Sequence, residues 1–580
     1  MTENQSNQKN KIWNSLIILF SFIGLLACTA LLFPHVRIMI MDWAEQIIQR
    51  EASTYQSWVR VLLSYAMGGI CFILFFDYCT LTNSGRALVL KVKQEIIECL
   101  SEIKFRSFLK PSLLLFGIYF LGIMTIIRAN YSYIDDLGHV ASAYRGWYNW
   151  DRYVTEFATI FVHANIRLTD ISPLPQLIAI FILSISSVLL INIIGNGKIT
   201  LISLLATIPL GLSPFILECL TFKVDAPYMA LSILASIFPF LFLARRKAFI
   251  FISVVSLLIM CMTYQAASGI YMMIVVIFCF QDWNKRVKTN KEILSFIWTS
   301  ALTFCFTMLL FKLFIMRPAE NYASNVVHPI AHLLSGTLSN IKEYAIIINH
   351  DFGTIWKILI AIIIFFFIAK SIYISAQSKI LSFIIAITVI AILFILSFGA
   401  YSLLVLPLFV PRAMFGFGVF LAIICIYVIA DYKKVATFTV LALNWCLFVF
   451  AFSYGNALSD QSRYADFRIG LLLHDLSNLY PSAGRDDLSI QINNSIDFAP
   501  TIKNISKHNP VIEKLVPSRL ADTCWDYYYL LEYFNYMKFE KANWHGERIN
   551  FDSLDLPVVL DSYYHTIQSD GEFVLIILKH

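Results

Sequence analysis

The feature that most constrains this chain is a series of long apolar segments that are almost free of charged residues. A helix needs about 20 apolar residues to cross a hydrocarbon core of about 30 Å. On this basis we expect about thirteen transmembrane helices, near residues 12–33, 58–78, 111–127, 173–194, 199–217, 227–243, 248–263, 266–281, 293–316, 354–370, 380–399, 413–430 and 435–452. The expected fold class is an all-α polytopic membrane protein with interfacial helices and a small C-terminal α/β domain.

Basic residues in the short connecting loops predict the orientation of these helices. A single helix over residues 248–280 would be about 50 Å long, so we expect it to break at residues 265–269. The basic clusters 245–247 and 285–288 then lie on one face, together with the basic segment before residue 110. We therefore place the N-terminus in the cytoplasm. The net charge of +6 is concentrated in these loops and indicates topology, not nucleic-acid binding.

Three domains follow from this pattern. Residues 1–110 form an N-terminal helix pair with a basic cytoplasmic linker, residues 111–452 form the transmembrane core, and residues 453–580 form a polar C-terminal domain on the outer face. Within the last domain we expect helices over residues 459–479 and 524–537 and a terminal hairpin over residues 563–578. Amphipathic spacing predicts helices lying flat in the membrane interface over residues 154–166 and 330–348.

The outer loop after the third segment carries two adjacent carboxylates, Asp135 and Asp136, in an aromatic stretch, YSYIDDLGHVASAYRGWYNWDR. Carboxylates at the membrane boundary reach water and can ionise, whereas carboxylates at the bilayer centre would suggest an ion path. Aromatic rings suit the apolar faces of sugars, and arginines suit phosphate oxygens. The alternative is an aromatic interface belt with incidental charges.

Most of the charged residues near the apolar segments fall at or just beyond the outer ends of these segments, which favours chemistry at the outer face over a conducting path. The exceptions are Lys312, inside a helix end, and Tyr264 and Gln265 at a predicted turn. Most of the candidates have a structural alternative: interface anchoring for the tryptophans, lipid headgroup binding for Arg152, a local ion pair for residues 218–225, and an ordinary polar turn for residues 264–265. The candidate substrate-binding residues are Arg145, Trp147, Trp150, Arg152, Glu218, Lys223, Asp225, Tyr264, Gln265 and Arg412.

Adjacent carboxylates point about 100° apart on a helix, so Asp135 and Asp136 are expected to divide their roles. One can take the proton of an attacking sugar hydroxyl, and the other can orient the acceptor, a cationic side chain or a divalent cation. Arg152, Lys223 and Arg412 can balance a phosphate leaving group. The structural alternative for the acidic pair is capping a helix or pairing with Arg145. No metal ligands are assigned, and a divalent cation stays open as a cofactor.

The acidic loop, together with four further stretches in the same order, resembles the polytopic serotype-converting O-antigen glucosyltransferases of the GT-C superfamily. The further stretches are LECLTFKVDAPYMALSILASIFPFL, MTYQAASGIY, VPRAMFGFGVF and YYHTIQSDGEFVLIILK, and the resemblance covers residues 111–580. The chain departs from the family at His139, where an arginine is frequent, and at residues 151–153. It keeps the acidic pair and Arg152.

The resemblance implies transfer of glucose, or a similar hexose, from an undecaprenyl-phosphate-linked donor to an O-antigen glycan. The reaction would take place at the periplasmic face of the bacterial inner membrane, with Asp135 or Asp136 as the base, so the expected partners are this donor, the glycan acceptor and membrane lipids. The alternatives are a lipid-linked transferase for another sugar or acceptor, such as lipid A or a protein, and an oligosaccharide flippase or polymerase.

Overall fold

The computed structural model describes residues 83–102, 105–141, 143, 145–195, 197, 199–316, 326–430, 434–481, 489–520 and 554–579. The expected spans at residues 12–33 and 58–78, and the expected helix at 524–537, lie outside this part of the chain. The described residues fall into two compact units. The first unit contains residues 83–102, 239–258 and 301–316, and the second contains the rest.

In the first unit, the amphipathic helix α4 (Asn83–Glu102) is fixed by its carboxylates. Glu98 forms an ion pair of 3.1 Å with Arg245, and Glu95 accepts a hydrogen bond of 3.1 Å from the backbone N–H of Ala248 at the start of α13 (Arg246–Cys261). The unit also holds η2 (Phe238–Phe242), the second half of α15 (Asn290–Leu310) and the π-helical turn η4 (Phe311–Ile315). Ionic contacts therefore connect α4 to the start of α13.

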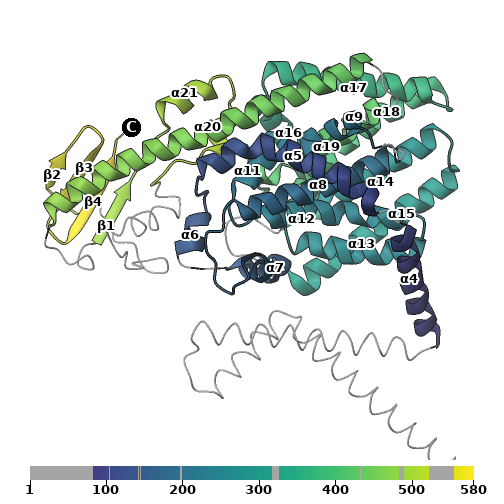
Figure 1. The fold of residues 1–580 in the computed structure, drawn as a ribbon, viewed down its shortest axis with the longest axis horizontal. Helices are drawn as coiled ribbons and strands as arrows, with labels where there is room; N and C mark the ends of the chain where they lie inside the picture. The colour runs from purple at the N-terminus through teal and green to yellow at the C-terminus, as the bar shows by residue number, and fades with distance from the viewer. Residues whose placement is uncertain are drawn as a thin grey trace, which may run out of the picture. The chain divides into compact units, whose positions relative to one another are not determined.

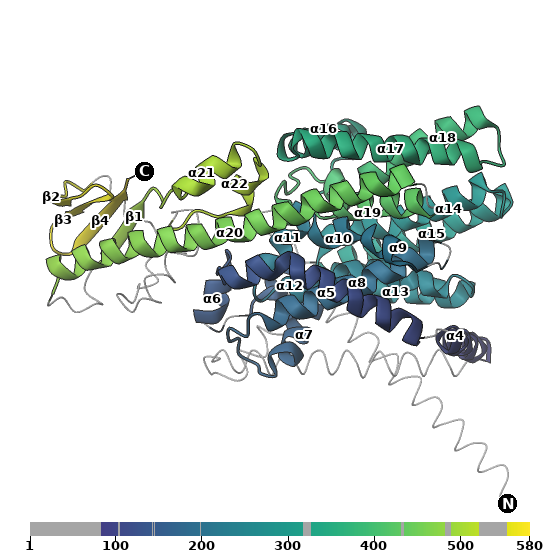
Figure 2. The same ribbon diagram turned by 45° about the horizontal axis from the view of Figure 1, so that its top comes forward.

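The second unit is a bundle of apolar helices, drawn in Figures 1 and 2. Helix α5 (Phe105–Ala129) packs against α8 (Leu174–Ile194) and α20 (Lys434–Leu479), and α8 packs against α12 (Ala226–Ile237). Helix α17 (Thr354–Ile374) contacts α18 (Lys379–Leu396), α19 (Gly416–Ile429) and α20, while α14 (Ser268–Asn284) contacts α18. Segments far apart in the sequence, α5 and α20, thus form one of the main helix pairs.

Seven helices in the described part of the chain are long and apolar enough to cross a membrane, or eight with one bent pair. In that pair, α9 (Leu201–Leu205) and α10 (Ile208–Leu212) continue into α11 (Pro214–Thr221) through a bend of 64°. Pro214 causes the break, because proline removes a backbone donor and clashes with the preceding turn. The chain is thus a mainly helical protein with several candidate membrane spans, and the expected number of thirteen stays a prediction.

The predicted interruption of residues 248–280 is confirmed. Helix α13 ends at Cys261, the short helix η3 (Gln265–Ala267) follows, and α14 begins at Ser268. The helix predicted over residues 154–166 is also present, as α7 (Tyr153–His163). Its Phe157 and Phe161 are 61% and 70% exposed, as expected of a helix with one apolar face toward lipid. Its place in the membrane interface stays a prediction.

Residues 330–348 form the short helix η5 (Ile330–His332) and α16 (Leu333–Asp351), which again exposes apolar side chains, Ile330, Leu334 and Leu338. Helix α16 packs on the turn η6 (Gly399–Leu403). Asn340 makes this contact specific, because its amide donates to the backbone oxygens of Ser402, at 3.1 Å, and Leu404, at 2.8 Å.

The C-terminal region begins inside a helix. Helix α20 runs without interruption for 46 residues, so the expected helix at 459–479 is its second half (Figure 2). Strands β1 (Ser489–Asn493), β2 (Val558–Asp561), β3 (His565–Ser569) and β4 (Phe573–Leu578) form one sheet in the order β1-β4-β3-β2. Only the β1–β4 pair is parallel, and the predicted hairpin is β3–β4, in which Ile567 faces Ile576.

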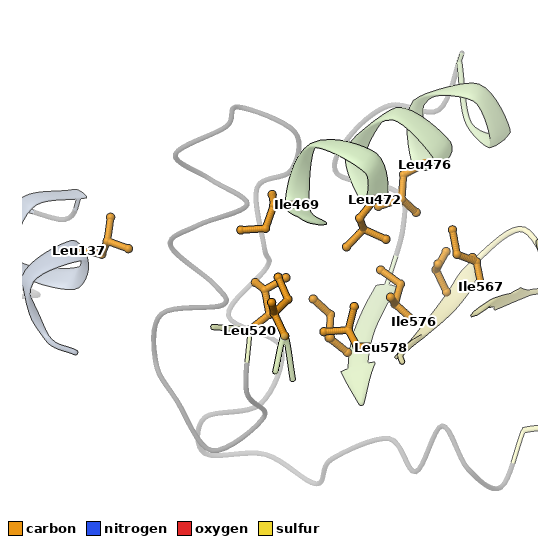
Figure 3. Close-up of a cluster of buried hydrophobic side chains, with 11 residues drawn as sticks. Leu137, Ile469, Leu472, Leu476, Leu520, Ile567, Ile576 and Leu578 are labelled. Carbon is orange, nitrogen blue, oxygen red and sulfur yellow. The ribbon is translucent and has the colours of Figure 1, made fainter. Parts of the chain in front are cut away.

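The sheet and the second half of α20 share a hydrophobic core, drawn in Figure 3. Leu472 and Leu476 from the helix pack with Ile567, Ile576 and Leu578 from β3 and β4. Two short helices, α21 (Pro500–Ser506) and α22 (Val511–Leu515), complete the region. The core thus attaches the sheet directly to the helix that enters the apolar bundle.

Candidate functional site

The acidic pair lies in a loop with an unusual backbone. Helix α5 ends at Ala129, and the next helix, α6 (Asp136–Ala141), begins at the second aspartate. Between them Asn130 and Ile134 have positive φ angles of 46° and 38°. Such angles suit glycine or asparagine, whereas a β-branched residue such as Ile134 adopts them only when its surroundings enforce it. The conformation at Asp135 is therefore imposed by contacts around the loop.

Asp136 is buried and bound to backbone amides. Its carboxylate accepts hydrogen bonds from the N–H groups of Tyr133 at 2.8 Å, Lys223 at 3.0 Å and Val224 at 3.3 Å. Burial raises its pKa to about 7, although the amides of Lys223 and Tyr133 act in the opposite direction. Asp136 thus fixes the acidic loop to the turn at residues 222–225, and its carboxylate accepts from loop amides and not from the first turn of a helix.

Asp135 has the opposite environment. Its side chain is exposed, and its carboxylate accepts no hydrogen bond from the residues that the structure describes. Surrounding protein still limits its hydration, so desolvation raises its pKa, and the neighbouring Asp225 acts in the same direction. His139, Arg412 and Arg152 lower it in part. Asp135 is therefore an accessible carboxylate with two arginines within electrostatic reach.

One of these arginines is held by a buried carboxylate. Glu218, on α11, accepts hydrogen bonds from the Arg412 side chain at 3.1 Å, from the Arg412 backbone N–H, and from the Tyr133 hydroxyl at 3.0 Å. Arg412 belongs to the short helix η7 (Pro411–Ala413), and its guanidinium lies 5.8 Å from the centre of the Phe222 ring. Glu218 therefore fixes Arg412 and the acidic loop together.

The other arginine, Arg152, precedes α7 and lies over an aromatic ring. Its guanidinium carbon is 4.6 Å from the centre of the Tyr264 ring, which in turn stacks on Phe415. This is the geometry of a cation–π contact. The buried Nε of Arg152 has no hydrogen-bond partner among the described residues. Arg152 is thus held by stacking and keeps hydrogen-bonding capacity for an acceptor.

An aromatic arrangement adjoins Asp135 through His139. The His139 ring stacks on Trp147 at 4.8 Å, and its Nε2 lies 4.0 Å from a carboxylate oxygen of Asp225. The Trp147 indole N–H donates to the other Asp225 oxygen at 2.6 Å. Trp147 is buried, so in this structure its ring supports the site from behind and presents no open face for a sugar.

The remaining predicted residues have other surroundings. Arg145 is buried against Glu156 at 3.5 Å, not against the acidic pair, and Lys223 pairs with Asp170 at 3.2 Å. Trp150 is 43% exposed. Gln265 is half-buried, and its side chain forms no hydrogen bond within the described residues, although its backbone oxygen accepts from the Ser268 N–H. The residues that gather around Asp135 are thus Arg152, Asp225 and Arg412, with Asp136, Glu218 and Tyr264 behind them.

Sequence reasoning missed two residues that organise the site. Tyr133 donates to Glu218, and Glu156 receives both Arg145 and the backbone N–H of Trp147, the latter at 3.0 Å. Glu156 had a signal, because it is the single carboxylate in the apolar stretch of α7. Tyr133 had none apart from its place two residues before the acidic pair. No three His, Cys, Asp or Glu side chains among the described residues converge to hold a metal ion.

The fold and site together define a class: a polytopic helical protein with one exposed carboxylate, flanked by arginines, in a loop between apolar helices. Residues 124–454 match the family described as Glucosyl transferase GtrII. The chain therefore belongs to this family of glucosyltransferases, which acts in O-antigen serotype conversion. It is also similar to an uncharacterized 55.3 kDa protein encoded in the gtrB 5' region of Salmonella phage P22. The two are 22% identical over 68% of this chain and 83% of the phage protein. No solved structure matches the chain.

Proposed function

We propose that the chain transfers a glucosyl group from an undecaprenyl-phosphate-linked donor to an O-antigen glycan at the periplasmic face of the inner membrane. Family membership supports glucosyl transfer, and the apolar helices support a membrane location. The basic loops support a cytoplasmic N-terminus and a periplasmic site and C-terminal region. The fold we propose is of the GT-C type. The observation that carries the mechanism is the contrast between exposed Asp135 and buried Asp136.

In the proposed reaction, Asp135 is the general base. Its carboxylate takes the proton of an acceptor hydroxyl, whose oxygen attacks the anomeric carbon of the donor sugar. The bond from that carbon to the phosphate oxygen breaks, and the polyprenyl phosphate leaves with the electron pair. A raised pKa makes Asp135 a stronger proton acceptor than an ordinary aspartate. A single displacement inverts the anomeric configuration, which NMR of the product linkage checks against a donor of known anomer.

Arg152 and Arg412 are proposed to bind the donor phosphate. Both act electrostatically on Asp135, so a phosphate held between them would lie beside the base. Glu218 and Tyr264 fix the two guanidinium groups before the donor arrives, and preorganised charges stabilise a developing anion without further rearrangement. Asp136 acts as a positioning residue, because its hydrogen-bonding capacity is taken up by backbone amides.

The test compares Asp135→Asn with Asp136→Asn in cells that make the lipid-linked donor. We expect Asp135→Asn to remove the added hexose from the surface glycan at a normal membrane level of the protein. Asp136→Asn should lower the amount of folded protein and reduce the modification without abolishing its chemistry. The exposed Asp561→Asn, on β2, is the matched control for loss of one carboxylate.

Mass spectrometry of the purified glycan reads the result. A mass change other than one hexose would favour a transferase for another sugar. An unmodified acceptor in wild-type cells, combined with loss of glycan export or shorter chains in a deletion strain, would favour a flippase or a polymerase. Full activity of Asp135→Asn would contradict the assignment of the base.

A further inference from the structure

The stretch before Asp135 is held by residues far away in the sequence. Ile134 has a φ angle of 38°, so residues 131–134 keep their conformation only through contacts with other elements. Tyr133 provides one such contact through Glu218. Lys223 provides a second, through a hydrogen bond of 3.4 Å from its Nζ to the Ser132 hydroxyl. Further contacts come from residues 514–520, named here the C-terminal segment, which includes the end of α22.

Arg519 contacts both Tyr131 and Ser132. Its guanidinium carbon lies 4.0 Å from the centre of the Tyr131 ring, and its Nη2 donates to the backbone oxygen of Ser132 at 2.5 Å. The Tyr131 hydroxyl donates to the backbone oxygen of Pro517 at 3.0 Å. Arg519 is 5% exposed and Tyr131 is 2% exposed, so these bonds are shielded from competing water. Two consecutive residues of the acidic loop are thus bound by one segment.

The C-terminal region also contacts the acidic loop after the acidic pair. Leu137, directly after Asp136, packs in the hydrophobic core that Leu520 shares with α20 and the sheet (Figure 3). The strand-like pairing of Ile496 with Arg519, through a hydrogen bond of 2.8 Å from Ile496 N–H to Arg519 O, joins this segment to the chain after β1. Asp135 and Asp136 therefore lie between two points of attachment to the C-terminal region.

The C-terminal segment is itself anchored to the helical bundle. Lys514 forms an ion pair of 2.6 Å with the buried Asp351 at the end of α16. Leu515 accepts a hydrogen bond of 3.1 Å from the hydroxyl of Tyr454 on α20, and Tyr454 also contacts Thr221 on α11. Helix α11 also carries Glu218, which binds Arg412. The same helix therefore contacts both the anchor of the C-terminal segment and Arg412.

We propose that the C-terminal segment is a positioning element of the transferase, in which Arg519 sets the place of the Asp135 carboxylate relative to the donor. This inference rests on the proposed function and extends it to a residue 384 positions away in the sequence. Arg519 touches neither substrate nor the reacting atoms. It acts through Tyr131 and Ser132, so the proposed role is limited to the C-terminal segment and does not extend to the sheet or to α21.

The experiment measures initial rates with purified protein in lipid nanodiscs, using polyprenyl-phosphate glucose as donor and purified unmodified glycan as acceptor. The variants are Arg519→Met, which keeps the side-chain length without the charge, and Arg519→Lys. We expect Arg519→Met to lower kcat by about 10- to 100-fold, because small misplacements of a catalytic group cost rates of this size. The donor KM should change by less than about twofold, because Arg519 is not expected to contact the donor. Arg519→Lys should recover part of the rate.

Two controls separate positioning from a merely structural role. Lys503→Met removes an exposed cation of α21, in the same region, and should keep the wild-type kcat. Tyr131→Phe removes only the hydrogen bond to Pro517 O and should lower kcat by a few fold with the protein folded. A reduced amount of folded protein with unchanged kcat per folded molecule in the Arg519 variants would overturn the inference.

The Asp135→Asn variant, assayed alongside, separates this inference from the proposed function. If Asp135→Asn is inactive and Arg519→Met turns over at the wild-type kcat, only the inference about Arg519 fails. If Asp135→Asn keeps full activity, the proposed function fails, and with it the reason for Arg519 to matter. A donor KM that rises together with the fall in kcat would instead place Arg519 in donor binding and would also overturn the inference.

Discussion

At the scale of single residues, the two aspartates show how neighbouring identical side chains can differ in exposure and hydrogen bonding. The backbone turn at Ile134 directs Asp136 into a set of amides and leaves Asp135 at the surface. The sequence predicted that the two carboxylates point in different directions, because adjacent positions on a helix do so. The division of roles expected from this, between a base and a group that orients the acceptor or a cation, stays a prediction. The sequence did not predict which aspartate takes which role, because the amides that bind Asp136 come from residues 223–224, in a different loop.

The pH dependence of the reaction should follow the ionisation of Asp135. A general base works only when deprotonated, so kcat/KM is expected to be constant at high pH and to fall as the pH drops through the pKa of Asp135. Because that pKa is raised, the fall should begin above the range of an ordinary aspartate. Initial rates across the acidic and neutral range measure it.

Two variants should shift the fall of kcat/KM at low pH, here called the acid limb, in opposite directions. Arg152→Gln removes a cation that lowers the pKa of Asp135, so the limb should shift to higher pH. Asp225→Asn removes an anion that raises the pKa, so the limb should shift to lower pH. The shape of the profile is compared, since both variants also change the maximum rate. If the acid limb keeps the same pH in both variants, a group other than Asp135 is responsible for it.

Asp136 makes a separate prediction about stability. Its pKa in the folded protein, about 7, lies above its ordinary value of 3.8, so its contribution is fully present below the ordinary pKa. That contribution is lost as the pH rises through the folded pKa. The unfolding temperature of the wild type should therefore fall between about pH 4 and pH 7 through this group.

Thermal unfolding measures this change. A thiol-reactive dye reports it, because the dye reacts with buried cysteines such as Cys261 only when unfolding exposes them. Asp136→Asn should be less stable overall, because an amide group replaces one acceptor of the Lys223 and Val224 amides. The difference in unfolding temperature between the wild type and Asp136→Asn should become smaller as the pH rises. An equal gap at both ends of the range would contradict the raised pKa.

At the scale of secondary-structure elements, the support for the acidic loop is the crossing of α5 and α20. Gly455 on α20 lies against α5 so closely that an added Cβ atom would be 2.4 Å from the Thr125 hydroxyl and 2.5 Å from the Thr125 carbonyl carbon. The Thr125 hydroxyl donates to the backbone oxygen of Ala451 at 3.2 Å. Small residues allow such close contacts between helices in membranes. Helix α5 leads directly into the loop with Asp135.

Gly455→Ala should therefore push α5 and α20 apart. We expect a lower unfolding temperature and a lower kcat, since the displacement reaches the loop that begins at Asn130. Gly470→Ala is the matched control on the same helix, because an added Cβ there meets no atom within 4 Å. It should be neutral or slightly stabilising, since alanine favours a helix over glycine. Equal effects of the two substitutions would contradict the role of the crossing.

At the scale of the whole molecule, hydropathy predicted the positions of the apolar helices more accurately than the residues at which they end or bend. The change to a polar composition at residue 453 predicts a domain boundary there, but α20 continues across it to Leu479. No proline lies between residues 453 and 479, so nothing in the covalent chain ends the helix. Conversely, residues 199–217 read as one apolar span and are bent at Pro214.

The charged residues of the site could be predicted from the sequence, but the residues with which they pair could not. The position of Asp135, Asp136, Arg152, Glu218 and Arg412 at the outer ends of apolar segments marked them as candidates. Their partners are set by long-range contacts, such as Glu218 with Arg412 and Tyr131 with Arg519. Such contacts join residues hundreds of positions apart, which local patterns do not encode. The sequence therefore predicted which charged residues lie at the site better than it predicted their partners.

The unbroken length of α20 also restricts how this protein can vary. One inserted residue between Gly455 and Leu472 would rotate everything beyond it by about 100° around the helix axis, because a helix has 3.6 residues per turn. The side of α20 that carries the sheet would then turn away from the acidic loop, although every contact within the sheet would remain intact. Insertions of seven residues, close to two full turns, would restore the direction but add about 10 Å. Relatives in which this helix has the same role should therefore keep its length almost constant while their loops vary freely.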